Sequence, residues 1–365
     1  MIGFGDCDKV KCGKSNISWR MERQDVDMNK VYGVALIGCG HMGEAHMEKI
    51  YAKENVSVKC VCDLNVERAK IFQRKYGAER IETDYRRCIN APDVDIVIIV
   101  TYPSTHLEIV KYCIEHKKHV ICEKPMTQDL ESGRELVRLV KENPDVKVLI
   151  GYILRHNETY NRVAQMIHDG AIGHPIIMRM AQNHHTMDWP KYLSLIRETS
   201  PIIDCGVHYI DVMQWFSGAK ITNVDGIGQK TSEDVPEGKY NYGLMTARLS
   251  DGSVAYYEAG WANTMSSDNL KEFIGPKGRI RLVYRKDRHF NKEEGDLLEY
   301  YRYPEKTYET MNIDCDRKPT DRQFDWLVKM IEEDAPANPS IDEAYDTFRV
   351  AVEADEAIRD TLKKG

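Results

Sequence analysis

Short apolar runs alternate with amphipathic segments over the first part of the chain, up to about residue 151. The apolar runs predict strands at 34–37, 56–62, 95–100, 119–122 and 146–150. The amphipathic segments between them predict helices at 65–76, 107–116 and 130–142. Strands that alternate with helices in this way predict a parallel sheet built from βαβ units. The β-branched content of 95–100 also indicates a strand buried on both faces.

The pattern changes near residue 172 to short segments of alternating residues, separated by turn signals such as Asp251-Gly252. These segments predict strands at 176–182, 242–249 and 253–259. They indicate a mainly antiparallel second domain. Two C-terminal helices are expected at 321–333 and 341–363. The predicted fold class is therefore α/β, with a doubly wound parallel sheet followed by a mainly antiparallel one.

The first predicted strand runs directly into a glycine-rich turn, Gly38-Cys39-Gly40-His41-Met42-Gly43. This spacing is typical of a turn that binds a dinucleotide. Its three glycines allow, in order, a tight turn, close approach of the backbone to a pyrophosphate and close packing of helix on strand. The following helix would direct its N-terminal amides at the phosphates. The alternative is a tight turn in a Rossmann-like domain that has lost its nucleotide.

The second predicted strand ends at Asp63, twenty residues after Gly43. A carboxylate at this point accepts the ribose hydroxyls of an adenosine, and it would repel the 2'-phosphate of NADP. The nearest cation is Arg68, whose spacing suits a helix surface at least as well as a phosphate contact. We therefore expect NAD, rather than NADP, as the cofactor.

The length of 365 residues is more than one hydrophobic core usually supports, so two domains are expected. We predict an N-terminal extension at 1–28, an NAD-binding domain at 29–151, and a substrate-binding and oligomerisation domain at 152–365. A net charge of −7 offers no basic field for nucleic acid, and no apolar run has the length of a membrane span. We expect a cytoplasmic protein.

Ten cysteines are spread singly along the chain, several of them in predicted strands. In a cytoplasmic protein such residues are expected to be small buried hydrophobes, and disulfides are not expected. Cys60 and Cys62 share one strand face without a second pair at zinc-site spacing, so no metal site is predicted.

The strand at 119–122 brings Glu123 and Lys124 to the edge of the doubly wound sheet where ligands bind. Beside a positively charged nicotinamide ring, the pKa of Lys124 should fall, so that it could transfer protons near neutral pH. Pro125 would fix the direction of this lysine, especially through a cis peptide bond. The alternative is an exposed lysine on a loop.

A second candidate cluster lies at 200–217, where Ser200 is expected to cap a helix. Asp204 and His208 are four residues apart and so share one helix face. A carboxylate one turn from an imidazole can fix its tautomer and raise its basicity, as a general base requires. The alternative is a surface pair, but Gly206 in mid-helix indicates close packing against this turn.

An aromatic and polar cluster follows the strand at 176–182 and could line a sugar-sized pocket. It contains His184, His185, Met187, Asp188, Trp189 and Tyr192. Adjacent histidines in a strand face opposite ways, so at most one of the two points inward. We take His185 and Tyr192 as the substrate contacts. Zinc ligation by one of these histidines with Asp204 and His208 is an alternative that we do not adopt.

These motifs together resemble the Gfo/Idh/MocA family, the group of glucose-fructose oxidoreductase and inositol dehydrogenase. The resemblance rests on the glycine turn, Asp63, Thr101-Tyr-Pro-Ser-Thr-His106, Glu123-Lys124-Pro125 and Asp204-x-x-x-His208. It covers about residues 31–360. It implies a Rossmann domain followed by an α/β domain with a large open sheet.

The resemblance further implies oxidation of a secondary alcohol on a sugar, cyclitol or glycoside, such as the 3-hydroxyl of a glucoside. It assigns catalysis to Lys124, Asp204 and His208. It also places Thr101, Pro103, His106, Glu123 and Lys124 beside the cofactor, and Arg155 near the substrate. Arg155-His156-Asn157 departs from the more usual arginine, aromatic, acid sequence, which leaves the substrate open.

In the mechanism we expect, His208 accepts the hydroxyl proton, Lys124 hydrogen-bonds the same oxygen and Asp204 orients His208, while hydride passes to the nicotinamide. Two alternatives remain. One is a redox-neutral, NAD-dependent glycosidase, and the other is a nucleotide- or sugar-sensing regulator, which the presence of all three residues disfavours. The open sheet face would be a sizeable apolar patch, so a homo-oligomer, dimer or tetramer, is expected.

Overall fold

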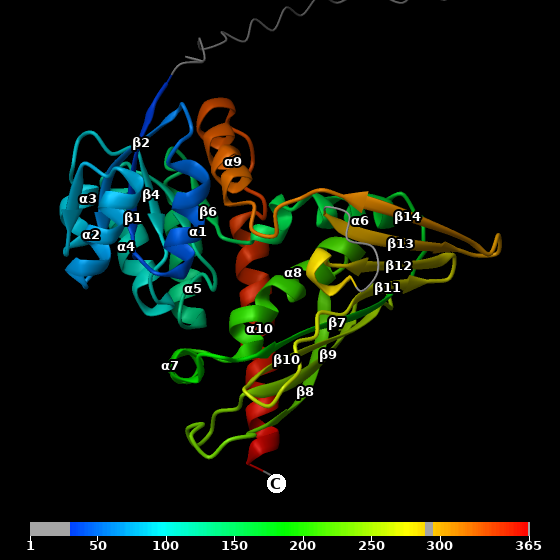
Figure 1. Cartoon of the computed structure of the whole chain (residues 1–365). Coiled ribbons are helices and arrows are strands. Elements are labelled where there is room, and N and C mark those ends of the chain that lie inside the picture. The colour runs from blue at the N-terminus through cyan, green and yellow to red at the C-terminus, as the bar shows by residue number, and fades with distance from the viewer. Residues whose placement is uncertain (1–29, 289–294, 364–365) are drawn as a thin grey trace, which may run out of the picture. The chain divides into compact units, whose positions relative to one another are not determined.

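Six parallel strands form the first sheet of the computed structural model, which describes residues 30–288 and 295–363 (Figure 1). The strands are β1 (Tyr32–Ile37), β2 (Val56–Cys62), β3 (Arg80–Glu82), β4 (Ile96–Ile99), β5 (His119–Cys122) and β6 (Val148–Ile150). Their order is β3-β2-β1-β4-β5-β6. The predicted parallel sheet is confirmed, and its order reverses between β1 and β4, the point beside which doubly wound sheets bind ligands. The extension predicted at 1–28 lies outside the described residues.

Helices cover both faces of this sheet. They are α1 (His41–Ile50), α2 (Val66–Tyr76), α3 (Tyr85–Ile89), α4 (Pro103–Glu115) and α5 (Leu130–Glu142). Every residue of β1, β4 and β6 is buried, which explains their continuous apolar runs. α4 begins earlier than the predicted residue 107, because Pro103 suits the first turn of a helix.

In the described part of the chain, the second sheet has eight strands in the order β14-β13-β12-β11-β7-β10-β9-β8. They are β7 (Ile177–His185), β8 (Ile221–Gln229), β9 (Tyr242–Leu249), β10 (Val254–Ala262), β11 (Lys271–Gly275), β12 (Gly278–Val283), β13 (Asp296–Arg302) and β14 (Thr307–Ile313). Neighbouring strands are antiparallel except for the parallel pair β7 and β10. The predicted mainly antiparallel sheet is thereby confirmed.

One face of the second sheet is covered by helices α6 (Glu158–His168), α8 (Val207–Ser217) and α10 (Ile341–Leu362) (Figure 1). Phe216 of α8 packs on Phe273 of β11, with ring centres 5.0 Å apart. The other face carries the alternate residues of each strand. In β9, for example, Met245 is buried whereas Thr246 is exposed. The helices therefore leave this second face open.

Helix α9 (Thr320–Glu333) departs from the predicted division at residue 152, because it packs on the first sheet. Phe324 and Leu327 are fully buried in one cluster with Leu36 of β1 and Met47 of α1. The Thr320 hydroxyl donates to the backbone carbonyl of Ala45 at 2.8 Å. The first domain is thus completed by a helix from the C-terminal part of the chain.

The structure corrects one expectation about the cysteines. Cys60 of β2 and Cys88 of α3 form a disulfide. Both are fully buried, as expected, but β2 and α3 pack closely enough to bring the two sulfur atoms together. Cys39, Cys62 and the other described free thiols are buried, apart from the partly exposed Cys315.

No helix in the described part of the chain is both long enough and apolar enough to cross a membrane.

Candidate active site and cofactor cleft

The glycine turn packs as its spacing requires. Gly38 has a φ of +105°, and a Cβ atom there would lie 2.7 Å from the carbonyl oxygen of Val100. A Cβ atom on Gly43 would lie 2.3 Å from the carbonyl oxygen of Gly38. A Cβ atom on Gly40 would meet nothing within 4 Å, because it would project into open space. The turn therefore leaves room at Gly40 for the backbone of α1 to meet a ligand.

A cavity of about 710 Å³ opens beside this turn. Its walls come from the carboxyl ends of the first sheet, from α1 and α4, and from α7 (Trp189–Glu198) of the second domain. The predicted residues among its lining are Gly38, Gly40, His41, Met42, Asp63, Thr101, Pro103, Glu123, Lys124 and Asp204. The N-terminus of α1 has no side-chain cap. Free amides at a helix start beside a cavity of this size fit a dinucleotide pyrophosphate.

Asp63 is held rigidly in the wall of this cavity. Its Oδ2 accepts a hydrogen bond from the backbone amide of Cys39, and its Oδ1 accepts one from that of Asn65, both at 2.8 Å. Arg68 also lines the cavity. The side chain of Asp63 is thus fixed by the glycine turn on one side and the start of α2 on the other.

His106 does not line the cavity as its place beside the cofactor suggested. It is fully buried, and its ring nitrogens lie 3.0 Å from the carbonyl oxygen of Pro125 and 3.1 Å from that of Thr101. Burial lowers the pKa of its imidazole. His106 therefore connects the two loops that follow β4 and β5.

Glu123 binds a partner that the sequence did not suggest. Its carboxylate lies 2.8 Å from Nε2 of His46, and both side chains are buried. Burial raises the pKa of Glu123, whereas the hydrogen bond and charge of His46 lower it. The lowering effects are larger together, so the pKa of Glu123 lies below its usual value. His46 follows the glycine turn by one turn of α1. The position of His46 on the inward face of α1 was the feature of the sequence that could have indicated this contact.

Lys124 and Asp204 form an ion pair between the two domains. The Lys124–Pro125 peptide bond is cis. Nζ of Lys124 donates to Oδ1 and to the backbone carbonyl of Asp204, each at 2.9 Å. Burial disfavours the ammonium, but the charge of Asp204 outweighs it and holds the pKa of Lys124 above its ordinary value. The fall that we expected beside a nicotinamide ring stays a prediction, because in the protein alone the largest charge effect on Lys124 is that of an anion.

The segment around Asp204 is helical but wider than predicted. Oγ of Ser200 accepts a hydrogen bond from the amide of Ile203 at 3.1 Å, as a cap does. The turn Ile202–Gly206 is a π-helix, a form often found at functional sites. A Cβ atom on Gly206 would lie 3.0 Å from the ring of Tyr257, which explains the glycine.

His208 follows this turn at the start of α8. In the described part of the chain Asp204 makes no hydrogen bond to His208, so the predicted orienting role is corrected: the carboxylate bonds Lys124 instead. Nδ1 of His208 is buried and has no hydrogen-bond partner among the described residues. Burial first, and the Lys124 charge second, lower the pKa of His208 to about 3. Its imidazole is therefore neutral at pH 7, and its basicity is lowered, not raised as we expected.

The two adjacent histidines of β7 face opposite sides of the sheet, and the structure corrects our choice between them. Nδ1 of His184 lies 3.0 Å from the hydroxyl of Tyr192, on the side where α7 and Asp204 lie. His185 is exposed, and its Nδ1 lies 3.1 Å from the carbonyl oxygen of Met265. The pairing of β7 with β10 and β11 determines which histidine faces which side of the sheet. The sequence could not show this, because the two neighbouring residues are identical.

Arg155 lies in the short 3-10 helix η1 (Ile153–His156), where its guanidinium is engaged. Its Nε and Nη2 donate to the two carboxylate oxygens of Asp211 at 2.7 and 2.8 Å. It also covers the ring of Trp215 at 4.8 Å, and only 7% of its surface is exposed. This arrangement gives Arg155 a structural role in place of the expected substrate contact.

Among the described residues, no three His, Cys, Asp or Glu side chains are arranged to hold a metal ion.

Two family models match the chain. The model of the oxidoreductase family with an NAD-binding Rossmann fold matches residues 32–152, and the Gfo/Idh/MocA C-terminal domain matches residues 160–281. The chain is 26% identical to a myo-inositol 2-dehydrogenase from Thermotoga maritima over 250 residues, 68% of this chain and 74% of the relative. It is 29% identical to an inositol 2-dehydrogenase from Saccharopolyspora erythraea over 231 residues, 63% of this chain and 67% of the relative.

A solved structure shows the same fold. Scyllo-inositol dehydrogenase from Lactobacillus casei, crystallised with NAD(H) and scyllo-inositol, superposes with a TM-score of 0.74 at 20% identity. The match covers 91% of this chain and 98% of that chain. With both domains matched in the same order, this chain belongs to the Gfo/Idh/MocA family of oxidoreductases.

Proposed function

We propose that this protein is an NAD-dependent dehydrogenase that oxidises a secondary hydroxyl of a sugar, cyclitol or glycoside. The observation that carries the proposal is the convergence of Lys124 and Asp204, from different domains, at the wall of the cavity that also holds the glycine turn. His208 lies one helical turn further along from Asp204. The names of the relatives favour a cyclitol within this substrate class.

The side chains divide the chemistry among them. A bound dinucleotide would supply the hydride acceptor. The neutral imidazole of His208 accepts the proton of the substrate hydroxyl, and the ammonium of Lys124 donates a hydrogen bond to the same oxygen as its negative charge develops. Asp204 holds Lys124 in place and keeps it protonated. The substrate loses a proton from oxygen and a hydride from carbon, and it leaves as the ketone.

NAD is the cofactor that Asp63 favours. Two backbone amides hold its carboxylate in the cavity wall, and the proposal is that it accepts the hydroxyls of an adenosine ribose there. The same charge opposes a 2'-phosphate. Arg68 lines the cavity as well, so the preference depends on the position of Asp63 relative to the ribose.

The test is NADH formation by the purified protein with NAD, and separately NADP, on a panel of inositols, hexoses and glucosides. Lys124→Ala is the matched control. A signal that needs Lys124 would support the dehydrogenase and identify its substrate. Binding of NAD without any turnover would overturn the proposal. Release of an aglycone without net NADH would indicate the redox-neutral glycosidase instead.

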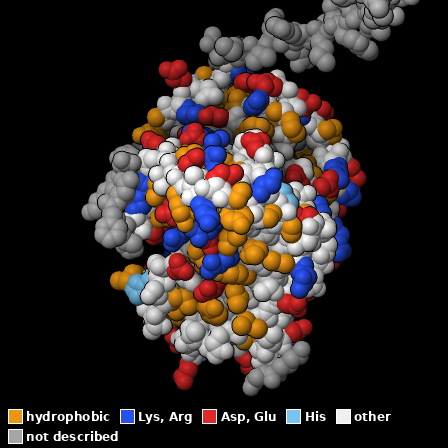
Figure 2. Space-filling view, turned by 90° about the vertical axis from the view of Figure 1, so that its right-hand side faces the viewer, with side chains coloured by type: hydrophobic (Ala, Val, Ile, Leu, Met, Phe, Trp, Pro, Cys, Tyr) orange, Lys and Arg blue, Asp and Glu red, His pale blue; other side chains and the backbone are white. Residues whose placement is uncertain are grey.

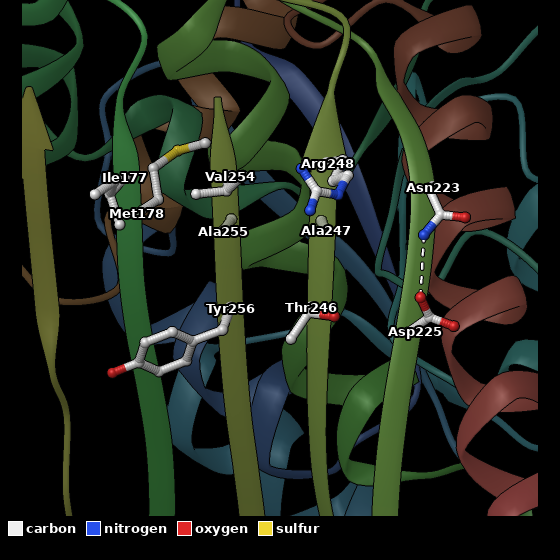
Figure 3. A pocket seen from close by; sticks show the side chains of 10 residues that line it. All are labelled: Ile177, Met178, Asn223, Asp225, Thr246, Ala247, Arg248, Val254, Ala255 and Tyr256. Carbon is white, nitrogen blue, oxygen red and sulfur yellow. Dashed lines mark hydrogen bonds between the residues drawn. The ribbon is translucent and has the colours of Figure 1, made fainter. Parts of the chain in front are cut away.

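We also infer that the open face of the second sheet pairs with a second copy of the chain. Figure 2 looks onto this side and shows hydrophobic side chains gathered among Lys and Arg. A shallow depression of about 380 Å³ lies on four of its strands (Figure 3). Register places Ile177, Val254 and Arg248 in one row across β7, β10 and β9. A sheet face that mixes apolar and charged side chains in this way suits a self-complementary interface.

Sedimentation of the purified protein tests this inference. We expect a dimer or tetramer, and we expect Val254→Asp to shift it towards smaller species. Ile71→Asp is the matched control, because Ile71 is an exposed apolar residue of α2, away from this face. A wild-type monomer would contradict the inference.

A further inference from the structure

The segment between β14 and α9 brings a lysine of the second domain to the glycine turn of the first. Nζ of Lys318 lies 2.9 Å from Nε2 of His41 and 3.6 Å from the sulfur of Met42. His41 is the first residue of α1, and both His41 and Met42 line the cavity. The ammonium of Lys318 thus reaches the N-terminus of the helix that begins at the cofactor cleft.

This position is fixed by the backbone on both sides of Lys318. The carboxylate of Asp316 accepts a hydrogen bond from Nζ of Lys49 at 2.6 Å, and its backbone carbonyl accepts one from the side chain of Asn157 at 3.0 Å. On the other side, the buried hydroxyl of Thr320 donates to the carbonyl of Ala45. These contacts hold the segment against α1. The backbone of the segment, and not only the side chain of Lys318, therefore places the ammonium beside His41.

In the part of the chain that the structure describes, no carboxylate makes a hydrogen bond or an ion pair with Lys318. Its recorded contacts are an imidazole nitrogen and a thioether sulfur. Burial lowers the pKa of Lys318, and the charge of Lys318 is the largest cause of the lowered pKa of His41. The Glu123 charge acts on Lys318 from a distance and raises its pKa by less than burial lowers it. Lys318 and the positive end of a helix dipole therefore converge without a hydrogen-bonded carboxylate among the described residues.

We propose that Lys318 binds the pyrophosphate of the dinucleotide, together with the first amides of α1. In NAD the pyrophosphate carries the negative charge, whereas the oxidised nicotinamide ring is positive and would repel an ammonium. A lysine at a helix N-terminus is a point-charge partner for phosphate. The second domain thereby contributes directly to cofactor binding. The proposal rests on the NAD-binding domain of the family and is independent of which substrate is oxidised.

The direct test is binding to the whole protein, measured by calorimetry without turnover. ADP-ribose carries the pyrophosphate but lacks nicotinamide, whereas adenosine lacks the phosphates. We expect Lys318→Gln to raise the Kd of ADP-ribose and of NAD by about 10-fold or more, because a charge-assisted hydrogen bond is lost. The Kd of adenosine should stay the same, and Lys318→Arg should recover most of the affinity.

Arg317→Gln is the matched control, because it removes one positive charge from the neighbouring exposed residue. Its Kd for ADP-ribose should stay within about 2-fold of wild type, since screening by solvent weakens an exposed charge. Unchanged ADP-ribose binding in Lys318→Gln would overturn the proposal. An equal loss in Arg317→Gln, or an equal loss for adenosine, would also overturn it by indicating a general field or a distorted turn.

Thermal unfolding without ligand separates the role in binding from a purely structural one. Lys318→Gln should melt at the wild-type temperature or above, because it removes a charge that faces His41. A clear fall in melting temperature together with weaker adenosine binding would identify Lys318 as a structural link between the domains, against the proposal. If the wild-type protein binds neither ADP-ribose nor NAD, the proposed NAD-dependent function itself is wrong. This result is distinguishable from a failure of the Lys318 proposal alone.

Discussion

Nζ of Lys124 donates to two oxygens of Asp204, the carboxylate Oδ1 and the backbone carbonyl, each at 2.9 Å. Lys124 follows β5 of the first domain, whereas Asp204 lies in the π-helical turn of the second. The pair therefore determines where the ammonium sits relative to His208. It also determines the charge of Lys124, because burial alone would lower its pKa.

Asp204→Asn should shift the pH dependence of the reaction. The amide keeps the shape of the side chain but removes the charge that raises the pKa of Lys124, so burial would then lower that pKa. We expect the alkaline limb of kcat/KM to move down by about one pH unit or more. The profile of NADH formation from pH 6 to 10 measures this shift, with NAD affinity as the control. An alkaline limb in the same place would contradict the role assigned to Asp204.

His208→Ala should reduce kcat by about 10²- to 10⁴-fold, the usual contribution of a general base. The Kd of NAD should be unchanged. Because the pKa of His208 is lowered to about 3, its imidazole is neutral throughout pH 5–8 in the free protein. The acid limb of kcat/KM in that range should therefore be absent or belong to another group. Rates and binding measured side by side check both statements, and full activity in the variant would refute them.

The parts of the site that depend on local sequence could be predicted. The packing of the glycine turn, the position of Asp63 just after β2 and the cap at Ser200 each follow from spacing within one strand-turn-helix unit. The close packing on Gly206 was also predictable, although its partner, Tyr257, was not. Short-range geometry is sufficient for such features, because a helix or strand repeats the same spacing wherever it occurs.

The contacts between distant segments could not be predicted. Asp204 is four residues from His208 on a helix, yet its carboxylate bonds Lys124, eighty positions away in the sequence. Arg155 was predicted to contact the substrate, but its guanidinium donates hydrogen bonds to the carboxylate of Asp211 instead. Lys318 gave no local signal, because only the return of α9 to the first sheet brings it to the first residues of α1. These contacts depend on how the two domains pack together, and the spacing of residues along the sequence carries no information about that packing.

Asp63→Ser should reverse part of the cofactor preference. The variant loses the charge that repels a 2'-phosphate and one of the acceptors for the ribose hydroxyls. We expect kcat/KM with NAD to fall by about 10-fold or more, and the ratio of NADP to NAD activity to rise. Asp63→Asn is the matched control, because it keeps an acceptor for the Cys39 or Asn65 amide while removing the charge. An unchanged ratio in both variants would show that Asp63 does not face the ribose.

Arg155 and Asp211 should behave as a buried ion pair, in which the loss of either partner leaves the other charge buried and lowers the stability of the fold. Arg155→Met leaves the carboxylate of Asp211 buried alone, and we expect it to lower the free energy of unfolding by about 3 kcal/mol or more. Asp211→Leu should cost a similar amount. The double variant should be more stable than either single one, because it removes both charges. Urea unfolding of the four proteins gives the coupling, and purely additive losses would contradict the pair.

Lys271 should make the stability of the fold depend on pH. Its side chain is fully buried, and its ammonium donates to the backbone carbonyls of Ala181 and Leu270 and lies 4.3 Å from the centre of the Tyr209 ring. Burial lowers its pKa to about 7, against the weaker opposing effect of the Asp268 carboxylate. Above that pH the folded protein carries a neutral amine where the unfolded chain still binds a proton.

The sign of the effect follows from this difference in bound protons. Between pH 7 and about 10, the unfolded state binds one more proton at Lys271, so the free energy of unfolding rises with pH by about 1.4 kcal/mol per unit from this group. Lys271→Met removes the effect, and other titrating groups cancel in the comparison. We expect the stability of the variant relative to wild type to fall by about 2 kcal/mol between pH 7.5 and 9.0, as measured by urea unfolding. A difference that stays constant over this range would show that Lys271 keeps its proton in the folded state.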